Sequence, residues 1–176
     1  MISANLPVLG FAAFSGTGKT HLLSLLIPLL KARNIRVGLI KHSHHDFDID
    51  HPGKDSYQLR AAGATPVMLV SPFRRAIISE LQPVQDIQLQ AQIELFPCEN
   101  LDLLLIEGFR HEAFAKIELH RPSLGKPLLY PNDPYIIAIA TDAALLEPSH
   151  LPVLDLNQPQ QIAEFILAYL ANYPHD

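Results

Sequence analysis

Short apolar runs alternate with longer segments of mixed polarity along this chain. These runs are continuous instead of alternating with polar residues, which is typical of strands buried on both faces of a sheet. The expected strands are Val8–Ala13, Ile35–Ile40, Leu101–Ile106, Ala115–Leu119, Tyr135–Ala140 and Val153–Leu156. Two further runs, Val67–Val70 and Ala76–Ser79, flank Ser71-Pro72-Phe73 and predict a hairpin.

Helical segments separate several of these strands. Lys19–Arg33 is apolar nearly all round and predicts a helix packed on a sheet, closed by Asn34 in a left-handed cap. The other expected helices are Asp55–Ala62, Val84–Phe96 and Pro159–Leu170. This order predicts one α/β domain over residues 1–176, with a mostly parallel sheet and helices on both faces.

Composition narrows the class of protein. The chain has 176 residues, of which 48% are hydrophobic and 18% charged, so a packed core is expected. A net charge of −5 argues against direct nucleic-acid binding, and lone Cys98 suits a reducing compartment.

The apolar stretch Leu6–Phe14 has no Lys or Arg before it and runs into a glycine-rich turn, which is unlike a signal peptide. No run approaches the ~20 apolar residues of a membrane span, so a cytoplasmic protein without membrane contact is expected.

The segment Ala13–Thr20, which reads Ala-Phe-Ser-Gly-Thr-Gly-Lys-Thr, lies between an expected strand and an expected helix. Glycines let the backbone turn its N–H groups around an anion, and the helix start adds unpaired donors. Lys19 is expected to bridge the β- and γ-phosphates, and Thr20 to ligate Mg²⁺. The pattern thus indicates a P-loop NTPase-type fold, although Ala13 replaces the usual first glycine; the alternative is an ordinary capped turn. The expected nucleotide-binding residues are Ser15, Gly16, Thr17, Gly18, Lys19 and Thr20, with Lys19 also catalytic.

Two carboxylates flank the strand at Leu103–Ile106, and their positions distinguish them. Glu107 follows the strand and should emerge at the same sheet edge as the phosphate loop, whereas Asp102 begins it, about 17 Å away. We therefore expect Glu107 to serve catalysis and the Mg²⁺-water shell, with Gly108 allowing close approach to a phosphate. The alternative is a solvated carboxylate at a strand end.

The loop after the second expected strand is rich in histidine and aspartate. If it is extended, His42, His44, Asp46, Asp48 and Asp50 share one face. These side chains suit either Mg²⁺ or a transition metal, and the alternative is a polar exposed edge. The hypothesis assigns Asp48 to the metal, and Lys41, His42 and Asp50 to the nucleotide.

Asp142 follows the strand Tyr135–Ala140 through Thr141. A carboxylate there can accept hydrogen bonds from guanine N1 and N2, but Asp before Ala143-Ala144-Leu145-Leu146 is also a good helix cap. No Asn-Lys-x-Asp signature occurs, so these residues leave GTP and ATP both open.

Taken together, four blocks resemble the MobB family of GTP-binding adapter proteins of molybdopterin-guanine dinucleotide synthesis; they are Phe11–Thr20, Gly38–Asp46, Pro52–Tyr57 and Ile106–Phe109. The resemblance implies GTP and Mg²⁺ as cofactors, a homodimer, weak GTPase activity, and a MobA-type nucleotidyltransferase as partner. Arg110 stands where that family leads us to expect Lys. Competing hypotheses are a kinase of a small cofactor precursor and a metal-delivery GTPase that uses the His-rich loop.

Overall fold

The chain forms two compact units in a computed structural model. The structure describes residues 2, 4–43, 45–81, 83 and 86–173. We call Met1–His42 with Gln88–Asp176 the sheet unit, and Ser43–Ile87 the hairpin unit. The expectation of one domain over residues 1–176 stays a prediction.

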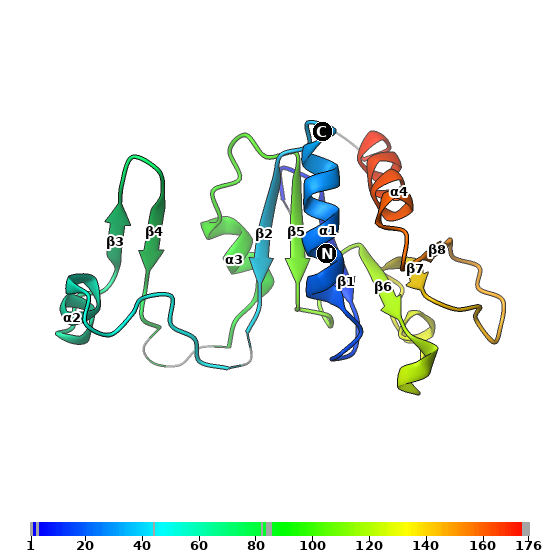
Figure 1. The fold of residues 1–176 in the computed structure, drawn as a ribbon, viewed down its shortest axis with the longest axis horizontal. Helices are drawn as coiled ribbons and strands as arrows, with labels where there is room; N and C mark the ends of the chain where they lie inside the picture. The colour runs from blue at the N-terminus through cyan, green and yellow to red at the C-terminus, as the bar shows by residue number, and fades with distance from the viewer. Residues whose placement is uncertain (1, 3, 44, 82, 84–85, 174–176) are drawn as a thin grey trace. The chain divides into compact units, whose positions relative to one another are not determined.

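Six parallel strands make up the sheet of the sheet unit, in the order β2-β5-β1-β6-β7-β8 (Figure 1). Their bounds are β1 Val8–Ala12, β2 Val37–Lys41, β5 Leu103–Glu107, β6 Lys116–His120, β7 Ile136–Thr141 and β8 Val153–Asp155. The parallel α/β architecture expected from the continuous apolar runs is confirmed.

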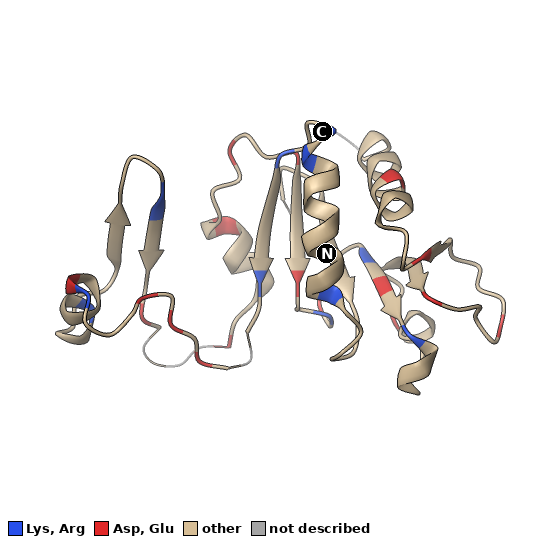
Figure 2. Cartoon of the chain, viewed as in Figure 1, with Lys and Arg blue, Asp and Glu red and all other residues tan. Residues whose placement is uncertain are grey.

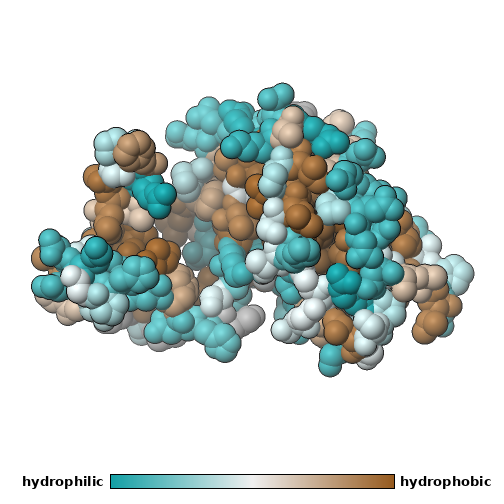
Figure 3. Space-filling view, viewed as in Figure 1, coloured by the Kyte–Doolittle hydropathy of each residue, from teal (hydrophilic) through white to brown (hydrophobic). Residues whose placement is uncertain are grey.

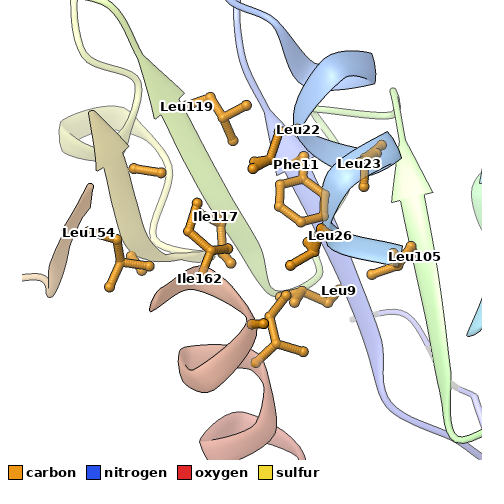
Figure 4. Close-up of a cluster of buried hydrophobic side chains, with 14 of the residues drawn as sticks. Leu9, Phe11, Leu22, Leu23, Leu26, Leu105, Ile117, Leu119, Leu154 and Ile162 are labelled. Atoms are coloured by element: carbon orange, nitrogen blue, oxygen red, sulfur yellow. The ribbon is translucent and has the colours of Figure 1, made fainter. Parts of the chain in front are cut away.

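Both faces of this sheet are covered. Alternate residues of a strand point to opposite faces, yet the whole of β5 is buried, from Leu103 to Glu107. Helices α1 (Lys19–Lys31) and α4 (Pro159–Ala171) pack together over one face, and Figure 4 shows their leucines and isoleucine meeting Leu9 and Phe11 of β1. On the other face a Cβ at Gly38 would meet Phe96, the residue after helix α3 (Leu89–Leu95).

Element ends differ from the expected ones where local hydrogen bonds intervene. Strand β2 begins at Val37 and not at Ile35, because the Ile35 N–H donates to the Leu30 carbonyl at 3.1 Å and closes α1. Asn34 takes the expected left-handed conformation, with φ 63°. Helix α3 is shorter than the expected Val84–Phe96, and it buries only Leu89 and Ile93, one turn apart. Val84 lies outside the described residues.

The hairpin unit contains helix α2 (Asp55–Ala61) and the antiparallel strands β3 (Val67–Val70) and β4 (Arg75–Ile78). The predicted hairpin is therefore confirmed. Asp55 is the first helical residue, and Lys54 holds the N-cap position. Figure 3 shows hydrophobic residues on the surface of the hairpin. The exposed large hydrophobic residues of this segment include Val70 and Phe73.

The proline-rich segment between β6 and β7 carries two short 3-10 turns, η1 (Pro122–Leu124) and η2 (Tyr130–Asn132). Glu118 of β6, which is 1% exposed, anchors it by accepting the backbone N–H groups of Leu129 and Tyr130 at 2.7 and 2.8 Å. Burial raises the pKa of Glu118 in spite of these bonds. Among the helices that the structure describes, none has the length and apolar character to cross a membrane.

Candidate functional site: the phosphate loop and the carboxyl edge of the sheet

All six strands of the sheet are parallel, so their carboxyl ends share one edge. The phosphate loop follows β1 there, and Glu107 and Thr141 close β5 and β7 at the same edge. Figure 2 shows charged residues where β2 and β5 end. Ligands of open α/β sheets bind at this edge, so the candidate site lies at the sheet edge that the sequence predicts.

The phosphate loop winds through two glycines in the left-handed region. Gly16 has φ 82° and Gly18 has φ 100°, conformations that side chains other than glycine rarely adopt. Thr17 between them is 2% exposed, and its hydroxyl donates to the Phe14 carbonyl at 2.8 Å. Apart from Gly16 and its two chain neighbours, no heavy atom of the described residues lies within 4 Å of a Cβ built at Gly16. The wound backbone and the free space beside Gly16 fit a bound anion.

Lys19 reaches back over this loop. Its Nζ donates to the carbonyl of Ala13 at 3.2 Å, so the ammonium is held above the loop. Burial lowers the pKa of Lys19, Glu107 opposes this effect, and Arg110 and Lys41 add to it. Ala13 itself lies outside the left-handed region, so this first loop position does not need glycine.

Thr20, Glu107 and Lys41 meet at the start of α1. The Thr20 hydroxyl and the Lys41 Nζ each donate to Glu107 Oε1 at 3.2 Å. Glu107 is 8% exposed, which makes it a nearly buried carboxylate with its partners at the loop. Hydroxyl and carboxylate oxygens are the ligands that Mg²⁺ prefers, so this group fits the expected ion.

Asp102 at the other end of β5 has a different partner. Its carboxylate accepts two hydrogen bonds from the Arg36 guanidinium, each at 2.8 Å. These bonds hold the pKa of Asp102 at about 2. The choice of Glu107 over Asp102 as the residue beside the phosphate loop is confirmed.

Gly108 is needed for packing against His42, the residue that follows β2. It has φ 106°, and a Cβ there would lie 2.7 Å from the Cβ of His42. The His42 N–H donates to the Glu107 carbonyl at 2.8 Å, and its ring stacks on Phe109 with centroids 4.5 Å apart. The contacts of Gly108 and His42 with a nucleotide stay predictions.

Sequence reasoning missed the buried cation that shapes the turn after Glu107. Lys116 is 1% exposed, and its Nζ donates to the Arg110 and Glu112 carbonyls at 3.0 and 2.7 Å and pairs with Asp133 at 2.8 Å. Arg110 in that turn lies over the Phe14 ring, 5.7 Å from its centroid. A lysine at the start of a strand gives no local signal of burial, since lysine side chains are usually exposed.

Asp142 lies against an arginine. Its Oδ2 accepts a hydrogen bond from Nη1 of Arg121, the residue that follows β6. The chain after Asp142 is bent and forms no helix as far as Leu151, so the helix-cap alternative is wrong. The cause is local, because the Thr141 hydroxyl donates to the Ala143 carbonyl at 3.0 Å and holds a turn. The assignment of Asp142 to the guanine base stays a prediction.

Asp48 and Asp50 belong to the hairpin unit, where local partners hold them. Asp48 pairs with Arg60, whose hydrogen bond lowers the pKa of Asp48, and accepts the Asp50 N–H at 3.0 Å. Asp50 Oδ1 accepts the His51 N–H at 2.9 Å and the Ser56 hydroxyl at 3.1 Å. Among the described residues, no three His, Cys, Asp or Glu side chains gather as a metal ion requires. His44 lies outside these residues, and the roles of Asp48 and Asp50 toward metal and nucleotide stay predictions.

Comparison with known proteins agrees with this fold and these motifs. The family model described as MobB, molybdopterin guanine dinucleotide synthesis protein B, matches residues 8–142. Two bacterial molybdopterin-guanine dinucleotide biosynthesis adapter proteins are similar to this chain over nearly all of their length. That of Escherichia coli (strain K12) is 45% identical over 94% of both chains, and that of Haemophilus influenzae is 43% identical over 96% of this chain and 92% of its own.

A crystal structure of Bacillus subtilis MobB has the same fold. Its TM-score with this chain is 0.71 at 24% sequence identity, over 96% of this chain and all of the other. The shared architecture is the P-loop NTPase-like arrangement of a mostly parallel sheet with helices. With the family model spanning the phosphate loop, Glu107 and Asp142, the chain belongs to the MobB family.

Proposed function

We propose that this chain is a GTP·Mg²⁺-binding adapter protein of molybdopterin-guanine dinucleotide biosynthesis. The two bacterial relatives support the adapter role, because they bear that name and match this chain over nearly its whole length. One observation supports the nucleotide most strongly, namely that Lys19, Thr20 and Glu107 converge on a loop of two left-handed glycines.

The phosphates of the nucleotide would lie in the loop from Ser15 to Thr20. Gly16 and Gly18 allow the backbone N–H groups to face an anion, and the N-terminus of α1 adds its dipole. Lys19 supplies a positive charge, and its attraction to a phosphate would be less screened by water because the side chain is partly buried.

The Mg²⁺ ion would be held by the hydroxyl of Thr20, with Glu107 in its water shell. Bound there, the ion would neutralise phosphate charge. The two side chains already share a hydrogen bond, so they need little rearrangement to face one ion. Lys41 pairs with Glu107 and balances its charge.

GTP hydrolysis by this protein alone is proposed to be weak. Fast phosphoryl transfer needs a cation that meets the transferred phosphate, and an arginine commonly supplies it. Arg110 lies over the Phe14 ring, and Arg121 is engaged by Asp142 and by the Thr17 carbonyl. Both guanidiniums have protein partners in this conformation, which supports a slow reaction.

The proposed partners are a second copy of the chain and a MobA-type nucleotidyltransferase, in the cytoplasm. The hairpin unit supports the homodimer, because it exposes apolar side chains that a solvated surface does not favour. Val70 is 72% exposed and Phe73 93%. A two-stranded hairpin is also marginal on its own, which favours a partner for its strands.

Calorimetric titration with GTP, GDP and ATP, each with and without Mg²⁺, tests this proposal. We expect binding of GTP that requires Mg²⁺, turnover well below ~1 s⁻¹, and a change in turnover when a MobA-type enzyme is added. Absence of nucleotide binding by the pure protein would refute the proposal. Transfer of phosphate to a small acceptor, observed by phosphorus NMR, would indicate a kinase instead.

A further inference from the structure

Arg121 connects two strand ends with the phosphate loop. Its Nε donates to the Thr17 carbonyl at 2.8 Å, across 104 positions of sequence, and its Nη1 donates to Asp142. Its Nη2 lies 3.8 Å from the position of a Cβ built at Gly18. The guanidinium therefore lies against the loop, held there by the carboxylate of the residue that follows β7.

The bond to Thr17 controls the direction of a neighbouring amide. In a trans peptide the carbonyl and the following N–H point in opposite directions. A donor on the Thr17 carbonyl therefore turns the Gly18 N–H away from Arg121. Thr17 is also held from within, because its hydroxyl donates to the Phe14 carbonyl. The Thr17–Gly18 peptide is thus fixed from both sides.

Preorganising this peptide favours anion binding. Fixing the backbone of a residue costs conformational entropy, and a loop that is ordered beforehand does not meet this cost when the ligand binds. Gly18 is one of the two loop residues for which this cost is greatest, because glycine has the largest conformational freedom. A hydrogen bond that fixes the Thr17–Gly18 peptide therefore acts at a position where ordering the loop costs much conformational entropy.

Asp142 has one carboxylate oxygen occupied by Arg121. Recognition of guanine N1 and N2 by a carboxylate uses both oxygens, one for each donor. The side chains of Arg121 and Asp142 are 29% and 22% exposed, so their pairing is partly shielded from solvent. The geometry therefore favours a carboxylate that orients the arginine over one that reads the base.

We propose that Arg121 is a positioning residue that braces the phosphate loop, and that Asp142 acts on the nucleotide through Arg121 and not through the base. This inference rests on the proposed nucleotide-binding function. The Arg121–Asp142 pair then contributes to phosphate affinity by the same amount for every nucleotide, whatever its base. Other residues select the base.

Binding of three ligands by four variants tests the inference. The ligands are GTP, ATP and inorganic tripolyphosphate, each with Mg²⁺, and the variants are Arg121→Ala, Arg121→Lys, Asp142→Asn and the double variant Arg121→Ala/Asp142→Asn. Arg121→Ala should weaken all three ligands by a similar factor, roughly tenfold, since a charge-assisted hydrogen bond is lost. Asp142→Asn should also weaken all three alike, and the double variant should be no weaker than Arg121→Ala. Lysine should restore part of the loss, because it can reach one partner but lacks the planar fork.

Arg36→Ala is the matched control. It removes another Arg–Asp pair, at the opposite end of the same sheet. We expect its ligand affinities to stay within twofold of wild type. Amide hydrogen exchange gives a second measurement on the ligand-free protein: in Arg121→Lys, exchange in the loop peptides should quicken while exchange in α4 stays unchanged.

The outcomes separate this inference from the function on which it rests. Loss of GTP affinity alone in Asp142→Asn would mean that Asp142 reads the base, and it would overturn the inference. Wild-type affinity for all three ligands in Arg121→Ala would overturn it as well, while binding that is still abolished by Lys19→Ala would leave the proposed function standing. A wild-type protein that binds none of the ligands would refute both.

Discussion

The hydroxyl of Thr20 donates to the carboxylate of Glu107 at 3.2 Å, across 87 positions of sequence. This contact follows from the strand order, because β1 and β5 are neighbours and Phe11 lies opposite Glu107 in their register. The loop after β1 must therefore emerge beside the residue that ends β5. The pair joins the two halves of the candidate site, the phosphate loop and the acidic strand end.

Lys19→Ala should weaken Mg²⁺·GTP binding by roughly ten- to hundredfold, because it removes at least one charge-assisted hydrogen bond to the phosphates. Calorimetric titration measures the change. Lys31→Ala is the control, since Lys31 is an exposed lysine in the last turn of the same helix. An affinity of Lys19→Ala within twofold of wild type would contradict the phosphate-loop assignment.

Glu107→Gln should slow GTP hydrolysis and weaken the dependence of GTP binding on Mg²⁺. Glutamine keeps an acceptor for Thr20 but lacks the negative charge that attracts the ion. Turnover and GTP affinity are measured across a Mg²⁺ titration. Asp102→Asn, at the opposite end of β5, should leave turnover and the Mg²⁺ dependence of GTP binding unchanged. A Glu107→Gln protein with wild-type Mg²⁺ dependence would exclude Glu107 from the metal shell.

Hydrogen exchange in the loop Lys41–Asp55 should slow when Mg²⁺ and a non-hydrolysable GTP analogue are added together. Ordering this segment costs about 1–2 kcal/mol per residue, which contacts with the γ-phosphate and the ion would offset. Zn²⁺ or Ni²⁺ alone should leave the exchange nearly unchanged. Tight stoichiometric binding of either metal, lost on replacing His42 and His44, would instead support a metal-delivery function.

Asp102→Asn should lower the melting temperature at neutral pH, and the difference from wild type should disappear in acid. Arg36 holds the pKa of Asp102 at about 2, below its ordinary value of about 3.9. A depressed carboxyl pKa stabilises the folded state above the ordinary value, and this contribution is lost as the pH falls through about 2. Thermal melts of both proteins between pH 7 and pH 2 measure it. The pair is exposed, so the difference should be small and should shrink in high salt. A difference that persists unchanged at pH 2 would exclude the ion pair as its source.

Lys116→Met should be strongly destabilising, by about 3–5 kcal/mol, since it leaves Asp133 and two carbonyl groups without their buried donor. Unfolding in urea measures the free energy. Lys31→Met, at an exposed position, is the control. The double variant Lys116→Met/Asp133→Asn should recover part of the loss, because no unpaired carboxylate remains. A loss no larger than that of Lys31→Met would show that the buried ammonium is not needed.

Local sequence patterns determined most of the elements and the centre of the site. Continuous apolar runs predicted the strands of the parallel sheet, and two glycines followed by Lys19 and Thr20 predicted the phosphate loop. Direction along a strand was enough to separate Glu107 from Asp102, because the two ends of a parallel strand lie at opposite edges of the sheet. These features depend on residues close together in sequence.

Only the tertiary structure decided which distant residues meet. The strand order brings Arg121 against both Thr17 and Asp142, and it buries Lys116 beside Asp133. No local pattern encodes these contacts, because a strand's periodicity reveals its buried faces but not its neighbours. Asp142 illustrates the difference: its local sequence suited a helix cap or a base contact equally, and the arginine that occupies its carboxylate comes from the end of another strand, 21 positions earlier.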